Sequence, residues 1–208
     1  SEGLAWAHDD GKWGFIDSTG EVVIPLSFTK VGNFVRGRAW VMKDGKWGHI
    51  DQEGKITTPL IYDRASDFSS SYTGSALHAS VMLDGLYGKV DINGESIIPC
   101  AYIGIDHYSM GLAKVKKPVD GGHKFGFVNQ EGKEVIPCIY DQVDRFAEGS
   151  EVTIVYKERL AGLVNREGEE ILPTRYLNIY PLGNDVFQVR DETDTYYFNS
   201  QGKQVEKP

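Results

Sequence analysis

The sequence has few of the residues and motifs that mark common active sites. Only two of its 208 residues are cysteines and five are histidines, and none of these has metal-ligand spacing to another. A Gly-rich phosphate loop, a Gly-x-Ser-x-Gly elbow and a Cys-x-x-Cys pair are all missing. Calcium is disfavoured because no loop has the pattern Asp-x-Asp-x-Asp-Gly. We therefore expect that the protein is not an enzyme and that it binds no metal or other cofactor.

Long apolar runs and an excess of basic residues are also missing. No segment approaches the roughly 20 apolar residues of a membrane-spanning helix, so no membrane span is expected. The net charge of −8 disfavours a nucleic-acid partner and favours solubility. The chain begins at Ser1 rather than methionine, so we expect a processed or truncated start.

What the sequence does contain is one short pattern in six copies. The clearest copies read Asp-Gly-Lys-Trp-Gly at 10–14 and at 44–48. The spacings between successive copies are 34, 40, 38, 36 and 34 residues. Such a period indicates a single repeat array, in which each repeat buries its apolar face against its neighbours. The approximate repeat bounds are 3–36, 37–73, 74–110, 111–148, 149–182 and 183–208.

Fixed landmarks follow the aromatic-glycine pair in each repeat. An Asp or Asn comes four residues after the aromatic, a glycine follows three residues later, and a proline stands twelve after the aromatic in the first five repeats. An aromatic lies three residues beyond each proline, and six further on come Phe34, Phe68, Tyr108, Phe146 and Leu182. These landmarks bound short alternating segments, which predict β-strands.

Local chemistry predicts the turns between these strands. Asp-Gly between two alternating runs favours a tight hairpin, because glycine tolerates positive φ. The Asx-x-x-Gly segment favours a type I turn followed by a left-handed glycine, with the Asx side chain bonded to backbone amides. Proline is expected to end or interrupt the third strand. The Tyr-x-x-Val-x-x-Phe segment fits either a short fourth strand or an irregular return.

Two further expectations concern small residues. The glycine after each aromatic predicts that a large group, in our interpretation a ring from the adjacent repeat, packs on the bare backbone. Small apolar segments such as Gly3-Leu4-Ala5 and Gly111-Leu112-Ala113 fit a crowded inner strand.

These residues resemble the WG-repeat family, defined by a Lys-Trp-Gly core and found mostly in bacterial proteins. The resemblance runs from Gly3 to about Val205 and weakens in the last two repeats, where the signature becomes Ala161-Gly162 and Thr195-Tyr196. It implies a β-rich repeat without a common activity, and it supplies no catalytic residues.

The predicted fold is all-β, with six tandem hairpin repeats of about 34–40 residues. We favour a propeller-like ring, since closure protects sheet edges, over an open β-solenoid stack. Cys100 and Cys138 occupy equivalent positions in neighbouring repeats, so we interpret them as unpaired apolar thiols. This favours a cytoplasmic location, with a secreted or periplasmic one as the alternative.

Function is sought where the repeats differ. Insertions between Phe68 and Ala79, which contain Tyr72 and His78, and at 116–123, which contain Asp120 and His123, fit either functional loops or tolerated surface insertions. Trp6 and Trp40 share one repeat position and fit either an exposed contact patch or packing between repeats. We expect a non-catalytic scaffold for a protein or peptide partner, such as an inhibitor or immunity-type binder. The alternative is a carbohydrate- or small-ligand-binding protein that uses exposed aromatics.

Overall fold

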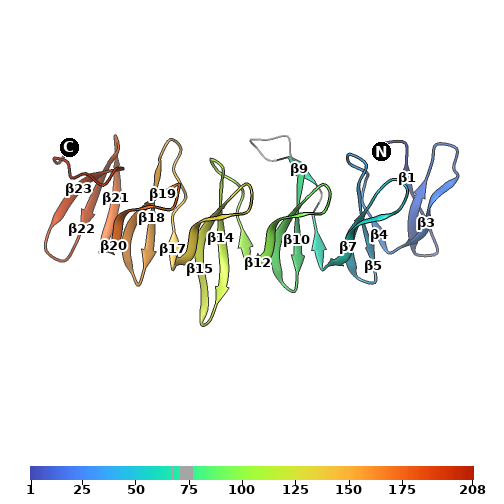
Figure 1. The fold of residues 1–208 in the computed structure, drawn as a ribbon, viewed down its shortest axis with the longest axis horizontal. Coiled ribbons are helices and arrows are strands. Elements are labelled where there is room, and N and C mark those ends of the chain that lie inside the picture. The colour runs from blue at the N-terminus through green and yellow to red at the C-terminus, as the bar shows by residue number, and fades with distance from the viewer. Residues whose placement is uncertain (67, 71–76) are drawn as a thin grey trace. The chain divides into compact units, whose positions relative to one another are not determined.

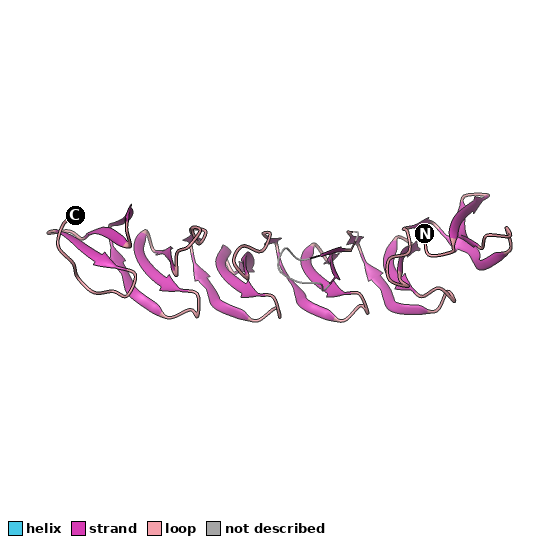
Figure 2. Ribbon diagram, turned by 90° about the horizontal axis from the view of Figure 1, so that it is seen from above, coloured by secondary structure: helices cyan, strands magenta, loops and turns pink. Residues whose placement is uncertain are grey.

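The described chain is built from strands and turns alone. The computed structural model describes residues 1–66, 68–70 and 77–208, and these contain no helix (Figure 2). The chain divides into an N-terminal unit, Ser1–Tyr102, and a C-terminal unit, Ile103–Pro208, each with three antiparallel sheets. No helix that could cross a membrane occurs in the described ranges. The expectation of an all-β chain of hairpin repeats is confirmed.

The strands follow the repeat closely (Figure 1). The N-terminal unit contains β1 (Ala5–Asp9), β2 (Lys12–Ile16), β3 (Val22–Phe28), β4 (Lys30–Val31), β5 (Ala39–Lys43), β6 (Lys46–Ile50), β7 (Ile56–Tyr62), β8 (Arg64–Ala65), β9 (Ser69–Ser70), β10 (Leu77–Leu83), β11 (Leu86–Asp91) and β12 (Ser96–Tyr102). The C-terminal unit contains β13 (Gly104–Ile105), β14 (Leu112–Val119), β15 (Gly122–Asn129), β16 (Glu134–Tyr140), β17 (Gln142–Val143), β18 (Val152–Lys157), β19 (Leu160–Asn165), β20 (Glu170–Tyr176), β21 (Asn178–Gly183), β22 (Val186–Arg190) and β23 (Thr195–Asn199).

The first four repeats each contribute three strands to one sheet and a two-residue strand to the next, whereas the fifth contributes the longer β21 and the sixth contributes β22 and β23. The fourth strand directly follows the third one in sequence and pairs with the first strand of the following repeat, as β4 pairs with β5 and β17 with β18. The Tyr-x-x-Val segment therefore forms the short strand rather than an irregular return. Because this strand leaves one repeat and completes the sheet of the next, it ties consecutive repeats together through the backbone.

The predicted turns are present. Asp10 and Gly11 both have positive φ, as the tight hairpin between β1 and β2 requires. At the second turn, the Asp17 carboxylate accepts hydrogen bonds from the backbone N–H groups of Thr19 (2.8 Å) and Glu21 (3.0 Å). Gly20 follows with φ of 87°. Small residues before the hairpins have two different causes, because Gly3 and Gly111 occupy left-handed turn positions whereas Ala113 is fully buried in β14.

The glycine of the Trp-Gly pair packs on its own repeat, not on a ring of the adjacent one. A Cβ on Gly14 would lie 2.4 Å from the carbonyl oxygen of Ile24 and 2.8 Å from the carbonyl carbon of Pro25. The strand register explains this closeness, since β3 bulges between the pairs Trp13–Phe28 and Phe15–Ile24. Our ring interpretation is therefore wrong: the crowding group is the bulge that proline makes in the third strand, which continues beyond it.

Each unit is held together by apolar cores that lie between consecutive sheets. In the N-terminal unit, Phe15, Ile24 and Phe34 pack with Val41 and Ile50 of the next sheet. The other cores of this kind join β5–β7 to β10–β11, β14–β16 to β18–β19, and β18–β20 to β21–β22. In the described part of the chain, each of these cores thus draws its side chains from two consecutive sheets, as the period of the sequence predicts.

The hairpin between β18 and β19 departs from the favoured turn sequence. Glu158 and Arg159 have φ of 53° and 68°, whereas the equivalent residues of the first repeats are Asp and Gly. A left-handed conformation costs a non-glycine residue about 1 kcal/mol. Arg159→Gly is thus expected to raise the free energy of unfolding by about 1 kcal/mol, measured by urea denaturation followed by circular dichroism. Gly85→Arg, at an equivalent position where an added Cβ would meet open space, should lower the free energy of unfolding by a similar amount. Equal stability of Arg159→Gly and the native chain would contradict this explanation.

Candidate binding cleft

A cavity lies in the C-terminal unit, between the segment that leads into β18 and the β21–β22 hairpin. Its volume is about 530 Å³, within the range of natural ligand pockets. Its walls come from two consecutive sheets of the unit. The lining residues are Asp144, Arg145, Ala147, Glu148, Gly149, Ser150, Glu151, Val152, Thr153, Ile154, Pro181, Gly183, Asp185, Val186, Phe187 and Ser200.

The first contribution to this cavity comes from the side chain at position 154, which is smaller than the tryptophan at the same position in the first two repeats. Ile154 pairs with Leu163 across β18 and β19, just as Trp40 pairs with His49 across β5 and β6, so the two residues occupy the same repeat position. Trp40 is only 4% exposed, and its ring lies 3.6 Å from His49 and 5.8 Å from Phe68, measured between centroids. The smaller Ile154 leaves part of this space open.

The second cause is a missing aromatic cap. In the first and fourth repeats, Phe34 and Phe146 are buried and pack edge-on against Phe15 and Phe127. The fifth repeat has Leu182 at this position, and it is 46% exposed. Strand β21 continues to Gly183 and pairs with β22, whereas the corresponding strands β4 and β17 stop after two residues. The longer strand therefore carries residue 182 out of the core.

The cleft has an apolar floor and an acidic rim. Val152, Ile154 and Phe187 form buried parts of the floor. Four carboxylates line the cleft, at Asp144, Glu148, Glu151 and Asp185, against the single basic residue Arg145. The Arg145 guanidinium pairs with Asp106 at 3.1 Å, so the excess negative charge at the rim stays largely uncompensated.

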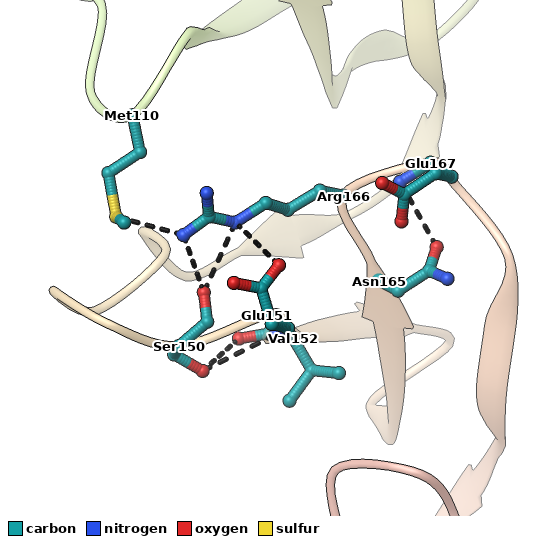
Figure 3. Close-up of polar contacts among 7 residues, drawn as sticks. All are labelled: Met110, Ser150, Glu151, Val152, Asn165, Arg166 and Glu167. Carbon is teal, nitrogen blue, oxygen red and sulfur yellow. Dashed lines mark hydrogen bonds and ion pairs between the residues drawn. The ribbon is translucent and has the colours of Figure 1, made fainter.

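Arg166 holds the rim segment in place from outside the cleft (Figure 3). Its Nη2 and Nε donate to the Ser150 carbonyl oxygen at 2.8 and 3.2 Å, and Nε lies 3.4 Å from a Glu151 carboxylate oxygen. The Ser150 hydroxyl in turn donates to the carbonyl oxygen of Val152 at 2.8 Å. These contacts fix the backbone of the rim, and such preorganisation lowers the cost of binding.

A second, smaller cavity of about 260 Å³ lies at the equivalent place one repeat earlier. Here Lys114 stands at the Trp40 position, and its ammonium donates to the Val143 carbonyl oxygen at 2.8 Å. Tyr108 also lines this cavity, and its hydroxyl donates to the Asn129 carbonyl oxygen at 3.2 Å. Burial, followed by the nearby charge of Glu131, raises the pKa of Tyr108 to about 12. The Lys114 side chain and the Phe146 cap account for the smaller volume.

The residues predicted from the sequence lie elsewhere. His78 is half-buried in β10, whereas Asp120 and His123 are exposed at the tip of the lengthened β14–β15 hairpin (Figure 1). Tyr72 and most of the first insertion lie outside the described residues. None of the described candidates lines the larger cavity.

Trp6 and Trp40 differ in their exposure to solvent. Trp6 is 56% exposed on β1 and lies 5.2 Å from Trp13, edge-on. Trp40 is buried under Phe68 and beside His49. An exposed patch of both tryptophans is therefore excluded, because packing within the repeat core covers Trp40. This removes one of the exposed aromatics on which a carbohydrate site was predicted.

Both cysteines are free, half-buried thiols beside the third-strand bulge. Burial, followed by the charge of Glu134, raises the pKa of the Cys138 thiol to about 12, and burial also raises that of Cys100. A thiol is a nucleophile only as the thiolate, and the raised pKa values disfavour that form.

The sequence did contain a signal for the cleft. Leu182 replaces the last aromatic landmark of the fifth repeat, and Ile154 stands where the first two repeats have tryptophan. A lost ring in a repeat core leaves volume that neighbouring repeats cannot fill, and this is where the cavity lies.

Comparison with known protein families gives matches along most of the chain. The family described as WG containing repeat matches residues 13–47, 47–86, 87–117, 125–158 and 162–192. No curated protein matches the chain.

Similar solved structures include a eukaryotic initiation factor, with TM-score 0.38, 8% identity and coverage of 99% of this chain and 62% of that chain. The AfRom2 CNH domain has a TM-score of 0.34 and 9% identity, with coverage of 98% of this chain and 80% of that chain. Kluyveromyces lactis Hsv2 has a TM-score of 0.31 and 10% identity, with coverage of 99% of this chain and 75% of that chain. The chain thus spans less than two thirds of the initiation factor. At these TM-scores the likeness carries no argument about ring closure or function.

Proposed function

The chain belongs to the WG containing repeat family, and from this premise we propose that it is a non-catalytic β-repeat scaffold that binds a segment of a protein or peptide partner in the cleft of the C-terminal unit. The observation that carries the proposal is the cavity of about 530 Å³ with its apolar floor and acidic rim. Within the C-terminal unit, consecutive sheets pack on each other and Arg166 fixes the rim, so the cleft is preformed. Rigid elements that present a concave surface are typical of repeat proteins that bind partners.

The composition of the cleft supports binding rather than catalysis. The described residues that line it include carboxylates, one arginine and three hydroxyl groups, but no histidine, cysteine or lysine. The Ser150 hydroxyl is engaged with the Val152 carbonyl oxygen rather than with a base. A nucleophile needs an adjacent base or a lowered pKa, and no such pair faces this cavity.

Selection of peptides from a random phage-displayed library on the full chain tests this function. We expect binders that lose at least tenfold in affinity on Ile154→Trp, because the indole fills the cleft as Trp40 fills its equivalent. Ala147→Trp, at the exposed rim, should weaken binding likewise without altering the core. Tyr87→Trp is the matched control, because it restores the repeat signature in the other unit.

Circular dichroism shows whether each variant is folded. Binders that respond to neither Ile154→Trp nor Ala147→Trp, or a selection that yields no binder, would contradict the proposal.

A further inference from the structure

The repeat array itself shows what side chain this kind of cavity accommodates. In the second repeat, the space above the first and second strands is filled by the indole of Trp40. The ring is sandwiched between His49, 3.6 Å away, and Phe68, which stacks at 5.8 Å with an interplanar angle of 21°. This pocket binds an aromatic ring that is supplied by the chain itself.

The fifth repeat retains the walls of such a pocket but not its occupant. Leu163 takes the place of His49 opposite residue 154 and is fully buried in the core, and Phe187 of the next sheet adds an aromatic wall to the cleft. Ile154 supplies less volume than an indole, and the exposed Leu182 supplies no cap. The open volume therefore lies where the second repeat holds large rings, and an aromatic side chain from outside would contact the apolar residues Val152, Ile154 and Phe187.

The charges at the rim determine which residues of the partner can flank its aromatic side chain. Glu151 is partly compensated by Arg166, and Arg145 is paired with Asp106. Asp144, Glu148 and Asp185 have no ion pair among the described residues. A partner with positive charges beside its aromatic residue would complement these carboxylates, whereas an acidic partner would be repelled.

We infer that the cleft receives an aromatic side chain, preferentially tryptophan, from a basic peptide segment. This inference rests on the proposed function and adds the chemistry of the partner. Aromatic anchors that enter a desolvated pocket dominate the energy of most protein interfaces. The acidic rim contributes selectivity and a dependence on ionic strength.

Three blocked synthetic peptides test the inference by fluorescence polarisation. The probe is Gly-Lys-Ser-Trp-Ser-Lys-Gly, and its two controls replace the tryptophan by alanine or both lysines by glutamate. We expect the probe to bind at least tenfold more tightly than either control, and more weakly as salt rises. Glu148→Lys should weaken probe binding at least threefold, whereas Glu167→Lys, the same charge change outside the cleft lining, should have a much smaller effect.

The outcomes separate this inference from the proposed function. If library peptides bind in a manner that depends on Ile154 but the probe binds no better than its controls, the inference is overturned and the function stands. Loss of all cleft-dependent binding would overturn both. Probe binding that survives Ile154→Trp and Ala147→Trp would place the peptide outside the cleft and overturn the inference as well.

Discussion

Acidification from pH 7 to pH 4 is expected to destabilise the N-terminal unit by about 3 kcal/mol through His49 alone. The imidazole is fully buried, its Nδ1 lies 3.0 Å from the Thr58 hydroxyl oxygen, and its Nε2 has no hydrogen-bond partner in the described structure. Burial, followed by the positive charge of Arg38, lowers the pKa of His49 from 6.5 to about 4. Charging this ring in the folded state is therefore strongly unfavourable.

The sign of the effect follows from proton binding. As pH falls below 6.5, the unfolded chain takes up a proton at His49 while the folded chain does not. The stabilising contribution is complete above pH 6.5 and is lost progressively down to about pH 4. One pKa unit corresponds to about 1.4 kcal/mol, which gives the total of about 3 kcal/mol.

Urea denaturation from pH 7 to pH 4, followed by tryptophan fluorescence, measures this loss, since all four tryptophans lie in the N-terminal unit. His49→Phe should reduce the pH dependence of stability, because phenylalanine does not titrate. The variant should fold, since Phe15 and Phe127 occupy the equivalent position in other repeats. His123→Phe replaces an exposed histidine and should leave the slope unchanged. A native slope that persists in His49→Phe would rule out this origin of acid sensitivity.

Much of the fold was predictable because its determinants are local. Asp-Gly hairpins and Asx-x-x-Gly turns depend on φ preferences and on hydrogen bonds within four residues, and both occur where the sequence places them. The period then implied that repeats pack on one another. The role of Gly14 could not be predicted in this way. The group that crowds it is the bulge at Pro25, and this contact depends on how β2 and β3 pair rather than on local sequence.

The cleft was harder to predict because it arises where side chains are smaller than those at equivalent positions of other repeats. Each lost ring, at 154 and at 182, is a tolerable aliphatic substitution when considered alone. Only their convergence on one cavity, together with the extension of β21, makes them a candidate site. Trp40 shows the reverse case, in which a residue suited to an exposed interface is buried by its own repeat.

Each hairpin is stabilised by packing on its neighbour within a unit. Two glycines allow this contact to be measured separately from the cost of the turn conformation. Gly20 and Gly94 occupy the same turn position with φ of 87° and 85°. A Cβ on Gly20 would meet open space, whereas a Cβ on Gly94 would lie 2.7 Å from Cβ of the buried Thr58 in the preceding sheet and still closer to its hydroxyl oxygen. Rotation of Thr58 does not relieve this clash, since its own Cβ is involved.

The most direct test is the free energy of unfolding of Gly20→Ala and Gly94→Ala, measured at pH 7 by urea denaturation with tryptophan fluorescence. Both variants place alanine in a left-handed conformation, which costs about 1 kcal/mol. Gly94→Ala must in addition separate two packed sheets, so we expect a total loss of about 3 kcal/mol. Equal losses in the two variants would contradict the claim that neighbouring repeats hold each other folded.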